Sequence, residues 1–110
     1  MRFPITMKPW GMEIEFINTP LYCYKMIVCV HGKWSSKGRF HYHVLKDETF
    51  LVKSGKLLLD TLDREYTLIP RQTIRVFPLV RHRFRSISRG CIFYEISTHH
   101  EEIDSIRVDN

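Results

Sequence analysis

Two histidines separated by one residue are the first feature of this sequence that could do chemistry. His41 and His43 flank Tyr42, and on a β-strand the two imidazoles would point to one face while Tyr42 points to the other. Glu48 follows five residues after His43, and Phe50 shares its face. Two imidazoles and a carboxylate form a ligand set suited to Mn, Fe, Co, Ni or Zn rather than to Ca or Mg. The cluster therefore predicts a site for one divalent transition metal.

A third histidine joins this set from further along the chain. His82 follows a proline turn and lies in the run 81–85, where arginines alternate with His82 and Phe84. The apolar Phe84 marks its own face as the interior one, so His82 also points inward. We therefore expect the metal to have four protein ligands: His41, His43, Glu48 and His82.

These side chains need fixed elements to position them, and the periodicity of the sequence predicts β-strands nearly throughout. Residues 13–17 alternate polar and apolar side chains, and residues 21–30 are rich in the types that suit a pleated sheet. The other expected strands are 40–43, 49–53, 56–62, 66–69, 73–77, 82–87 and 91–97. Eight or nine short strands separated by turn signals predict an all-β sandwich or barrel with little helix.

The organisation of the chain is simple, because it has no internal repeat, low-complexity tract or linker. Residues 1–110 are expected to form one domain, with the barrel core at about 12–98. The segment 99–110 begins with the polar stretch 99–102 and then carries three apolar residues. We expect that polar stretch to be a solvated tail. The remainder is compatible with a final strand, a short helical turn or a segment that docks on a partner.

Composition narrows the class of protein. The 110 residues are 44% apolar and 26% charged, as in an ordinary soluble domain, and no apolar run approaches the roughly 20 residues that span a membrane. Two prolines and a lysine interrupt residues 1–10, which predicts no signal peptide and a cytoplasmic location. Cys23, Cys29 and Cys91 are expected to be reduced residues in or near the core.

The positive charge of the chain is concentrated in one region. The net charge is +5, and six arginines fall within residues 71–89. Arg81, Arg83 and Arg85 face away from His82 by strand alternation, so we expect a solvated outer face or an interface with a second subunit. A nucleic-acid partner is not expected, because no helix is predicted that could enter a groove.

The spacing of the metal ligands resembles the first motif of the cupin superfamily. That motif, G-x5-H-x-H-x3,4-E-x6-G, is matched by His41-x-His43-x4-Glu48-x6-Gly55, and a proline with His82 resembles part of the second motif. The resemblance covers roughly positions 10–98. It implies a cupin jelly-roll β-barrel, also called a double-stranded β-helix, with the metal inside its mouth.

Four positions depart from these motifs. The motifs have glycine at the first three of these positions and asparagine at the fourth, where this chain has Ser35, Arg71, Leu79 and Ser86. None of the four is a metal ligand, so the departures concern the turns of the barrel rather than the ligand set.

A narrower resemblance concerns the substrate. Short phrases at 10–13, 22–25, 46–50 and 95–99 are similar to the cupin module of type II mannose-6-phosphate isomerase and mannose-1-phosphate guanylyltransferase proteins. This similarity implies a sugar-like small molecule as the ligand. Together with the many apolar strands, whose edges need cover, it also implies a homodimer.

The first functional hypothesis is a metal-dependent isomerase or epimerase that acts on a sugar or sugar phosphate. A metal ion would polarise a carbonyl, and a base would move a proton between neighbouring carbons. Lys25, Tyr94 and Glu95 are the candidates for that base.

Two other classes stay open on the sequence alone. One is a non-catalytic module that binds a sugar or a small acid, and the other is an Fe(II)-dependent dioxygenase. In each case Phe50, Phe84 and Trp34 are expected to line the substrate pocket.

Overall fold

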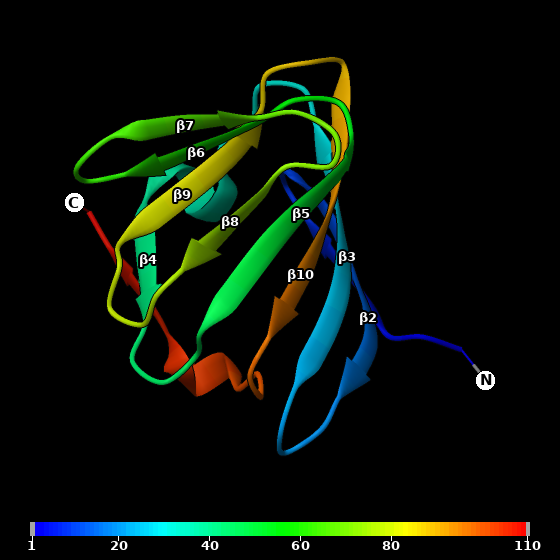
Figure 1. Cartoon of the computed structure of the whole chain (residues 1–110), viewed down its shortest axis with the longest axis vertical. Coiled ribbons are helices and arrows are strands. Elements are labelled where there is room, and N and C mark those ends of the chain that lie inside the picture. The colour runs from blue at the N-terminus through cyan, green and yellow to red at the C-terminus, as the bar shows by residue number, and fades with distance from the viewer. Residues whose placement is uncertain (1, 110) are drawn as a thin grey trace.

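Alternating inward and outward side chains build a two-layered barrel over residues 2–109, the part of the chain that this computed structural model describes. Its strands form two antiparallel sheets that face each other (Figure 1). The first sheet contains, in spatial order, β1 (Ile5–Lys8), β2 (Gly11–Asn18), β3 (Cys23–Val30), β10 (Gly90–Ser97), β5 (Glu48–Ser54) and β8 (Thr73–Val76). The second contains β11 (Ser105–Val108), β4 (Phe40–His43), β9 (His82–Ser86), β6 (Leu57–Thr61) and β7 (Glu65–Leu68).

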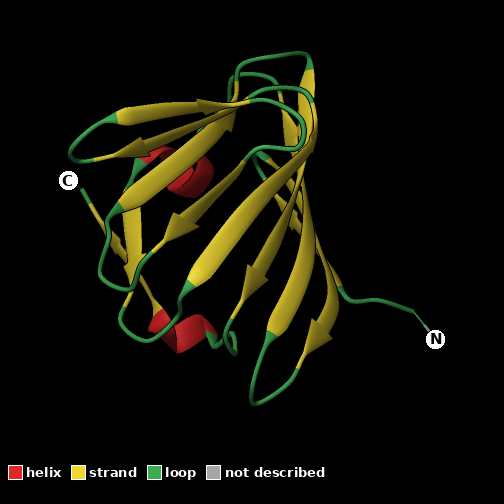
Figure 2. Cartoon of the chain, viewed as in Figure 1, coloured by secondary structure: helices red, strands yellow, loops and turns green. Residues whose placement is uncertain are grey.

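The order of the strands is that of a jelly roll. From β4 to β6 the chain passes from the second sheet to the first and back, and from β8 to β11 it crosses at every step. Within residues 2–109 the only helical elements are the short 3-10 turns η1 (Ser35–Gly38) and η2 (Glu102–Asp104) (Figure 2). The all-β jelly-roll barrel with little helix is therefore confirmed. No helix among these residues has the length and apolar character that a membrane span requires.

The inner faces of the two sheets meet in an apolar core. Phe50 and Val52 of β5 are each 1% exposed, and the ring of Phe93 on the neighbouring β10 is fully buried, 4.9 Å from that of Phe50. Leu57 and Leu59 of the second sheet are fully buried in the same cluster. The three cysteines are free and buried, as predicted. Burial of each large side chain contributes roughly 1.5–3 kcal/mol, so this cluster is the main source of stability.

Two turns of the barrel keep a left-handed backbone without the glycine that such a turn favours. Arg71 has a φ of 76° and Leu79 a φ of 72°. Gly55, which matches the motif, has a φ of 78°, and a Cβ there would lie 2.1 Å from the carbonyl oxygen of Gly90. The departures noted in the sequence therefore leave the turns intact, at a cost of roughly 1–2 kcal/mol for each non-glycine residue.

The two ends of the chain are more ordered than the sequence indicated. β1 was not predicted, because Ile5 and Met7 point to solvent and no alternation marks the strand. Near the other end, η2 is followed by β11, which pairs with β4. The open choice for this segment thus resolves into a helical turn and a final strand, and both lie beside the strand that carries His41 and His43.

Candidate metal centre

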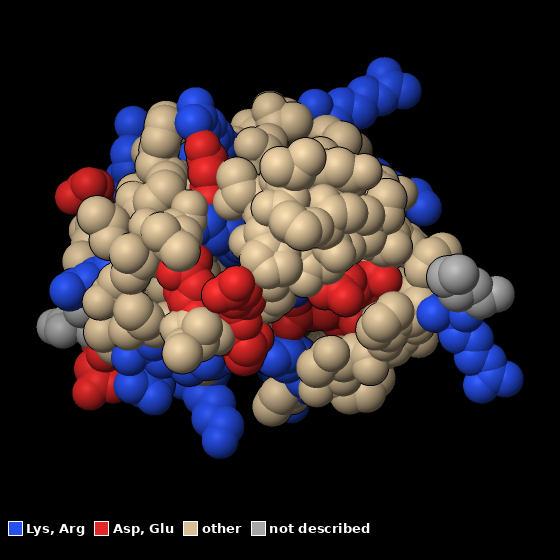
Figure 3. Space-filling model, turned by 90° about the horizontal axis from the view of Figure 1, so that it is seen from below, with Lys and Arg blue, Asp and Glu red and all other residues tan. Residues whose placement is uncertain are grey.

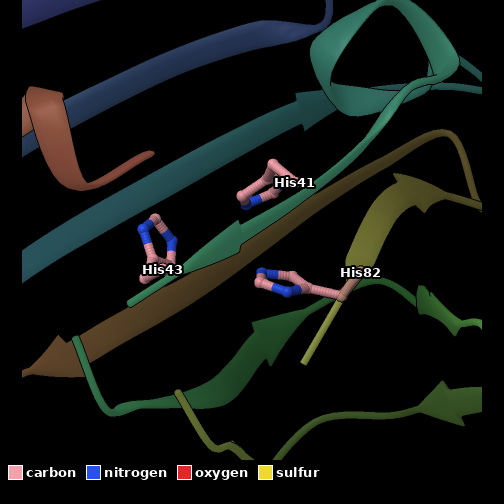
Figure 4. Close-up of side chains that lie close together, drawn as sticks. All are labelled: His41, His43 and His82. Atoms are coloured by element: carbon pink, nitrogen blue, oxygen red, sulfur yellow. The ribbon is translucent and has the colours of Figure 1, made fainter. Parts of the chain in front are cut away.

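Three histidine rings converge at one end of the barrel interior. β4 presents His41 and His43 on one face, and β9 places His82 directly opposite His41. Figure 4 shows the three side chains pointing toward a common space from these two strands. One nitrogen from each ring lies within 4.8 Å of the others, a separation that a single metal ion can bridge.

The outer ring nitrogens of two of these histidines are held by backbone carbonyls. Nδ1 of His43 lies 3.2 Å from the carbonyl oxygen of Asp104, and Nδ1 of His82 lies 2.9 Å from that of Val80. When Nδ1 donates such a hydrogen bond, Nε2 of the neutral ring carries a lone pair that can bind a metal. Nε2 of His82 and Nδ1 of His41 are buried without a hydrogen-bond partner. The donor set and its unpaired nitrogens fit a transition metal.

The fourth expected ligand, Glu48, lies between two of the rings. Its side chain is 1% exposed, with Oε2 3.0 Å from Nε2 of His43 and Oε1 3.7 Å from Nε2 of His82. Burial alone would raise the pKa of Glu48, but Lys46 and the two histidines hold that pKa well below its usual range. Burial and the neighbouring His82 ring lower the pKa of His41 well below its usual value. These shifts favour the neutral imidazole of His41 and the ionised carboxylate of Glu48, the forms that bind metals.

Lys46 is a member of the site that the sequence did not reveal. It lies in the loop between β4 and β5, and its side chain is only 3% exposed. Nζ lies 3.1 Å from Oε2 of Glu95, 3.2 Å from Nδ1 of His100 and 3.7 Å from Oε2 of Glu48. Burial acts to lower the pKa of Lys46, but Glu95 and Glu48 raise it overall. Lys46 is therefore a buried cation beside the candidate metal centre.

A cavity of about 510 Å³ is lined by His41 and His43. Lys25 and Glu95 are neighbours in the register of β3 and β10, and both line it. Tyr94 points to the opposite side of β10, where its ring centroid lies 5.7 Å from that of Tyr24. Two of the three candidate bases are thus in the cavity. Seen from below, acidic side chains gather around a hollow near the middle of the face, with basic side chains beside them (Figure 3).

The three expected pocket residues are in different places. Phe84 lines the cavity together with Trp10, whose ring lies edge-on at a centroid distance of 5.0 Å. Phe50 lies deeper, in the apolar core, with its ring centroid 6.2 Å from that of His82. Trp34 is outside the cavity lining and stacks under the guanidinium of Arg83, 4.0 Å away. Of the three, Phe84 is the residue that lines the cavity.

The arginines on the outside of β9 are engaged with the protein. Arg83 donates to Asp60 at 2.8 Å and to the carbonyl oxygen of Gly38 at 2.8 Å. The guanidinium of Arg85 lies 4.8 Å from the ring of Trp34. These side chains therefore point away from His82, as strand alternation predicts, and hold the η1 loop to β9.

The prediction of a solvated tail at 99–102 is wrong for two of its residues. Nδ1 of His99 lies 2.7 Å from the carbonyl oxygen of Thr19. His100, whose side chain is 16% exposed, lines the cavity and contacts Lys46. The tail is therefore part of the wall of the site.

No family model and no curated protein matches this sequence. Among solved structures, the capsular polysaccharide assembling protein CapF from Staphylococcus aureus is similar with a TM-score of 0.85 and 17% identity over 100% of this chain, which spans about a third (32%) of CapF. Pac13, described as a nucleoside dehydratase, is similar with a TM-score of 0.83 and 14% identity, covering 98% of this chain and 86% of Pac13. A cupin-2 domain protein from Shewanella frigidimarina has a TM-score of 0.63 and 18% identity, covering 87% and 80% of the two chains.

These likenesses establish the class of fold. The chain has the cupin fold, a jelly-roll barrel, with three histidines converging inside it. At such identities the comparisons carry the fold alone, so the activity has to be argued from the site.

Proposed function

We propose that this protein binds one divalent transition metal, Mn, Fe, Ni, Co or Zn, through His41, His43, His82 and Glu48. The observation that carries the proposal is the orientation of the rings. The carbonyls of Val80 and Asp104 hold two outer nitrogens and so turn the inner nitrogens toward one another. A bound divalent ion supplies Lewis acidity to an oxygen of the ligand.

We further propose that the site belongs to an isomerase or epimerase that acts on a sugar or sugar phosphate. Both the resemblance to sugar-handling cupins and the likeness to CapF and Pac13 support a sugar-containing ligand. Glu95 is the leading candidate for the base, because it lines the cavity and lies directly opposite Lys25 in the register of β10 and β3. Lys25 is the second candidate, and Tyr94 drops out because it faces the outside of the sheet.

A non-catalytic module for a sugar or small acid is the alternative that one observation favours. Four of the charged groups that line the cavity are paired with one another: Lys46 with Glu95 at 3.1 Å, and Lys25 with Glu13 at 3.4 Å. A carboxylate that is paired with a lysine can accept hydrogen bonds from a bound ligand as readily as it can accept a proton from it.

Metal content is the first test. We expect about one transition metal per chain by mass spectrometry of untagged protein, and its loss in the His43→Ala, Glu48→Ala double variant. His31→Ala is the matched control, because that histidine is exposed and bonds the carbonyl of Ser88. Wild-type protein that stays metal-free after incubation with Mn, Fe, Ni and Zn would overturn the metal site.

The reaction is tested in deuterated water with the metal-loaded protein. Aldose and ketose phosphates should gain deuterium at the carbon beside the carbonyl, as NMR can follow. Glu95→Gln, assayed at a metal concentration that saturates the variant, should abolish this exchange. Ligand-induced shifts without exchange would favour the binding module. Oxygen uptake by the iron-loaded protein would instead indicate the Fe(II)-dependent dioxygenase.

We also propose that the protein is a cytoplasmic homodimer. Three reduced cysteines fit a reducing compartment. β1 is an edge strand whose Ile5 and Met7 are 58% and 72% exposed, and an exposed apolar edge needs cover. Light scattering during gel filtration should give twice the chain mass, and a monomer at all concentrations would contradict the dimer.

A further inference from the structure

A buried lysine shares a carboxylate with the candidate metal site. Lys46 is 3% exposed and Glu48 is 1% exposed, and Nζ of the first lies 3.7 Å from Oε2 of the second. The same carboxylate oxygen lies 3.0 Å from Nε2 of His43. One negative charge therefore lies between a permanent internal cation and the place where a metal cation would bind.

The position of Lys46 does not depend on Glu48. Its ammonium has two closer partners, Glu95 at 3.1 Å and His100 at 3.2 Å. Its backbone is held from the other side, because the carboxylate of Asp104 accepts the N–H groups of residues 44, 45 and 46 at 2.9–3.2 Å. Lys46 can therefore stay in place whether Glu48 pairs with it or with a metal.

Removing water makes the competition strong. Two like charges a few ångströms apart repel each other far more in a buried site than in water, and a carboxylate between them neutralises only one. A buried ammonium is also costly unless it has partners, which explains why Lys46 is surrounded by three. A plain structural ion pair would need only Glu95.

We propose that Lys46 is a built-in counter-ion that competes with the metal for Glu48. This inference rests on the proposed metal function. In the metal-free protein, Lys46 neutralises Glu48 and keeps this end of the barrel folded. In the metal-loaded protein, Glu48 binds the metal, and Lys46 remains in contact with Glu95 and His100. Lys46 thereby stabilises the empty site and lowers its metal affinity, which makes the metal exchangeable.

The test is the dissociation constant for Zn²⁺, measured by competition with a chromophoric chelator and repeated with Mn²⁺. Lys46→Met should bind at least about tenfold more tightly, which is about 1.4 kcal/mol. The metal-free form of the same variant should melt at least about 5 °C lower, because Glu48 and Glu95 lose their cation. Saturating Zn²⁺ should raise the melting temperature of Lys46→Met by more than it raises that of the wild type, because the variant binds the ion more tightly.

Two further variants serve as a control and as an independent test of the role of Lys46. Lys25→Met removes another buried lysine of the same cavity, whose ammonium pairs with Glu13, and should change the Zn²⁺ affinity by less than about threefold. Glu95→Gln leaves Lys46 with Glu48 as its only carboxylate, so it should weaken Zn²⁺ binding at least about threefold. If Lys46→Met does not fold without metal, Glu95→Gln carries the test.

The outcomes separate the two proposals. Wild-type protein that binds Zn²⁺, with unchanged or weaker affinity in Lys46→Met, would overturn the counter-ion role and leave the metal site standing. Unchanged affinity in Glu95→Gln would also overturn it. Failure of every protein to bind metal would overturn the metal site, and the counter-ion role with it.

Discussion

The interior of this barrel has two unlike ends, although the same strands build both. Four strands change from a polar to an apolar inward residue within two positions: Lys25 to Ile27 on β3, Glu95 to Phe93 on β10, Glu48 to Phe50 on β5, and His82 to Phe84 on β9. We call the first residue of each pair the polar end and the second the apolar end. An inward position therefore does not by itself make a residue part of the core. Burial of apolar side chains at the apolar end stabilises the fold, whereas burial of charged groups at the polar end lowers the free energy of unfolding.

The largest effect is expected at the apolar end. Phe93→Ala should lower the free energy of unfolding by about 3–5 kcal/mol, because a fully buried ring is lost and a cavity remains. Urea unfolding of metal-free protein measures this change. If the two ends are separable, folded Phe93→Ala protein keeps its metal affinity. A loss below about 1 kcal/mol would contradict the assignment of stability to this end.

A ligand substitution at the polar end should do the reverse. His82→Gln should weaken metal binding at least about 100-fold, because the buried Nε2 is lost while the side-chain volume is similar. The free energy of unfolding without metal should change by less than about 2 kcal/mol. Titration calorimetry and urea unfolding of one preparation give both numbers. Metal binding at wild-type strength would remove His82 from the site.

The two ends should also differ in their response to pH. The native pKa of His41 is lowered, so below about pH 6.5 the unfolded chain binds a proton that the native protein does not. The free energy of unfolding of chelator-treated protein should therefore fall as pH drops below 6.5. The depressed pKa of Glu48 adds a further loss below about pH 4.5, where the unfolded chain binds a proton that the native carboxylate does not.

Matched variants assign this pH dependence to one end. His41→Gln should flatten the decline between about pH 6.5 and 5, whereas Phe93→Leu at the apolar end should leave its slope unchanged. Thermal unfolding across this range makes the comparison. An unchanged slope in His41→Gln would show that other groups carry the effect.

The smallest effect is expected from left-handed backbone strain, which occurs at both ends. Leu79 donates its N–H to the carbonyl oxygen of His43 at the polar end, and Arg71 donates to that of Val52 at the apolar end, both from left-handed backbone. Leu79→Gly and Arg71→Gly should each stabilise the fold by about 0.5–1 kcal/mol, the relief of strain less the entropy of glycine. Alanine at either position should give no gain. Urea unfolding of the four variants is the measurement, and destabilisation by glycine would refute the strain.

The strands and the inward direction of the expected ligands could be predicted from the alternation of side chains in the sequence. All nine segments predicted as strands contain one, and the inward directions of His41, His43, Glu48 and His82 follow from period two. Sequence alone could not choose between Tyr94 and Glu95. The choice came from pairing, because Glu95 lies opposite the buried Lys25. Alternation divides the residues of a strand between two faces. Where both faces carry polar and apolar residues, it does not show which face points into the barrel.

The residues that escaped prediction are those whose direction is set by distant partners. Lys46 lies in a loop, where no periodicity fixes a side chain, and it is aimed inward by Asp104, which is 58 residues away. Trp34 was expected at the pocket, but its ring stacks on the guanidinium of Arg83 and is not among the residues that line the cavity. β1 escaped because its apolar side chains are exposed. Local patterns describe strands well, whereas loops take their shape from contacts across the sequence.

The anchoring of residues 44–46 by Asp104 has a consequence for the order in which the protein is made. A growing chain contains both β4 histidines, Glu48 and His82 long before it contains Asp104, which is 61 residues beyond His43. The barrel strands can collapse during synthesis, but His43 and the loop that follows it lack their anchor until η2 and β11 emerge. The proposed metal site is therefore completed only when η2 and β11 have joined the barrel, and we expect a chain that ends before residue 104 to lack the hydrogen bonds that hold His43 and residues 44–46.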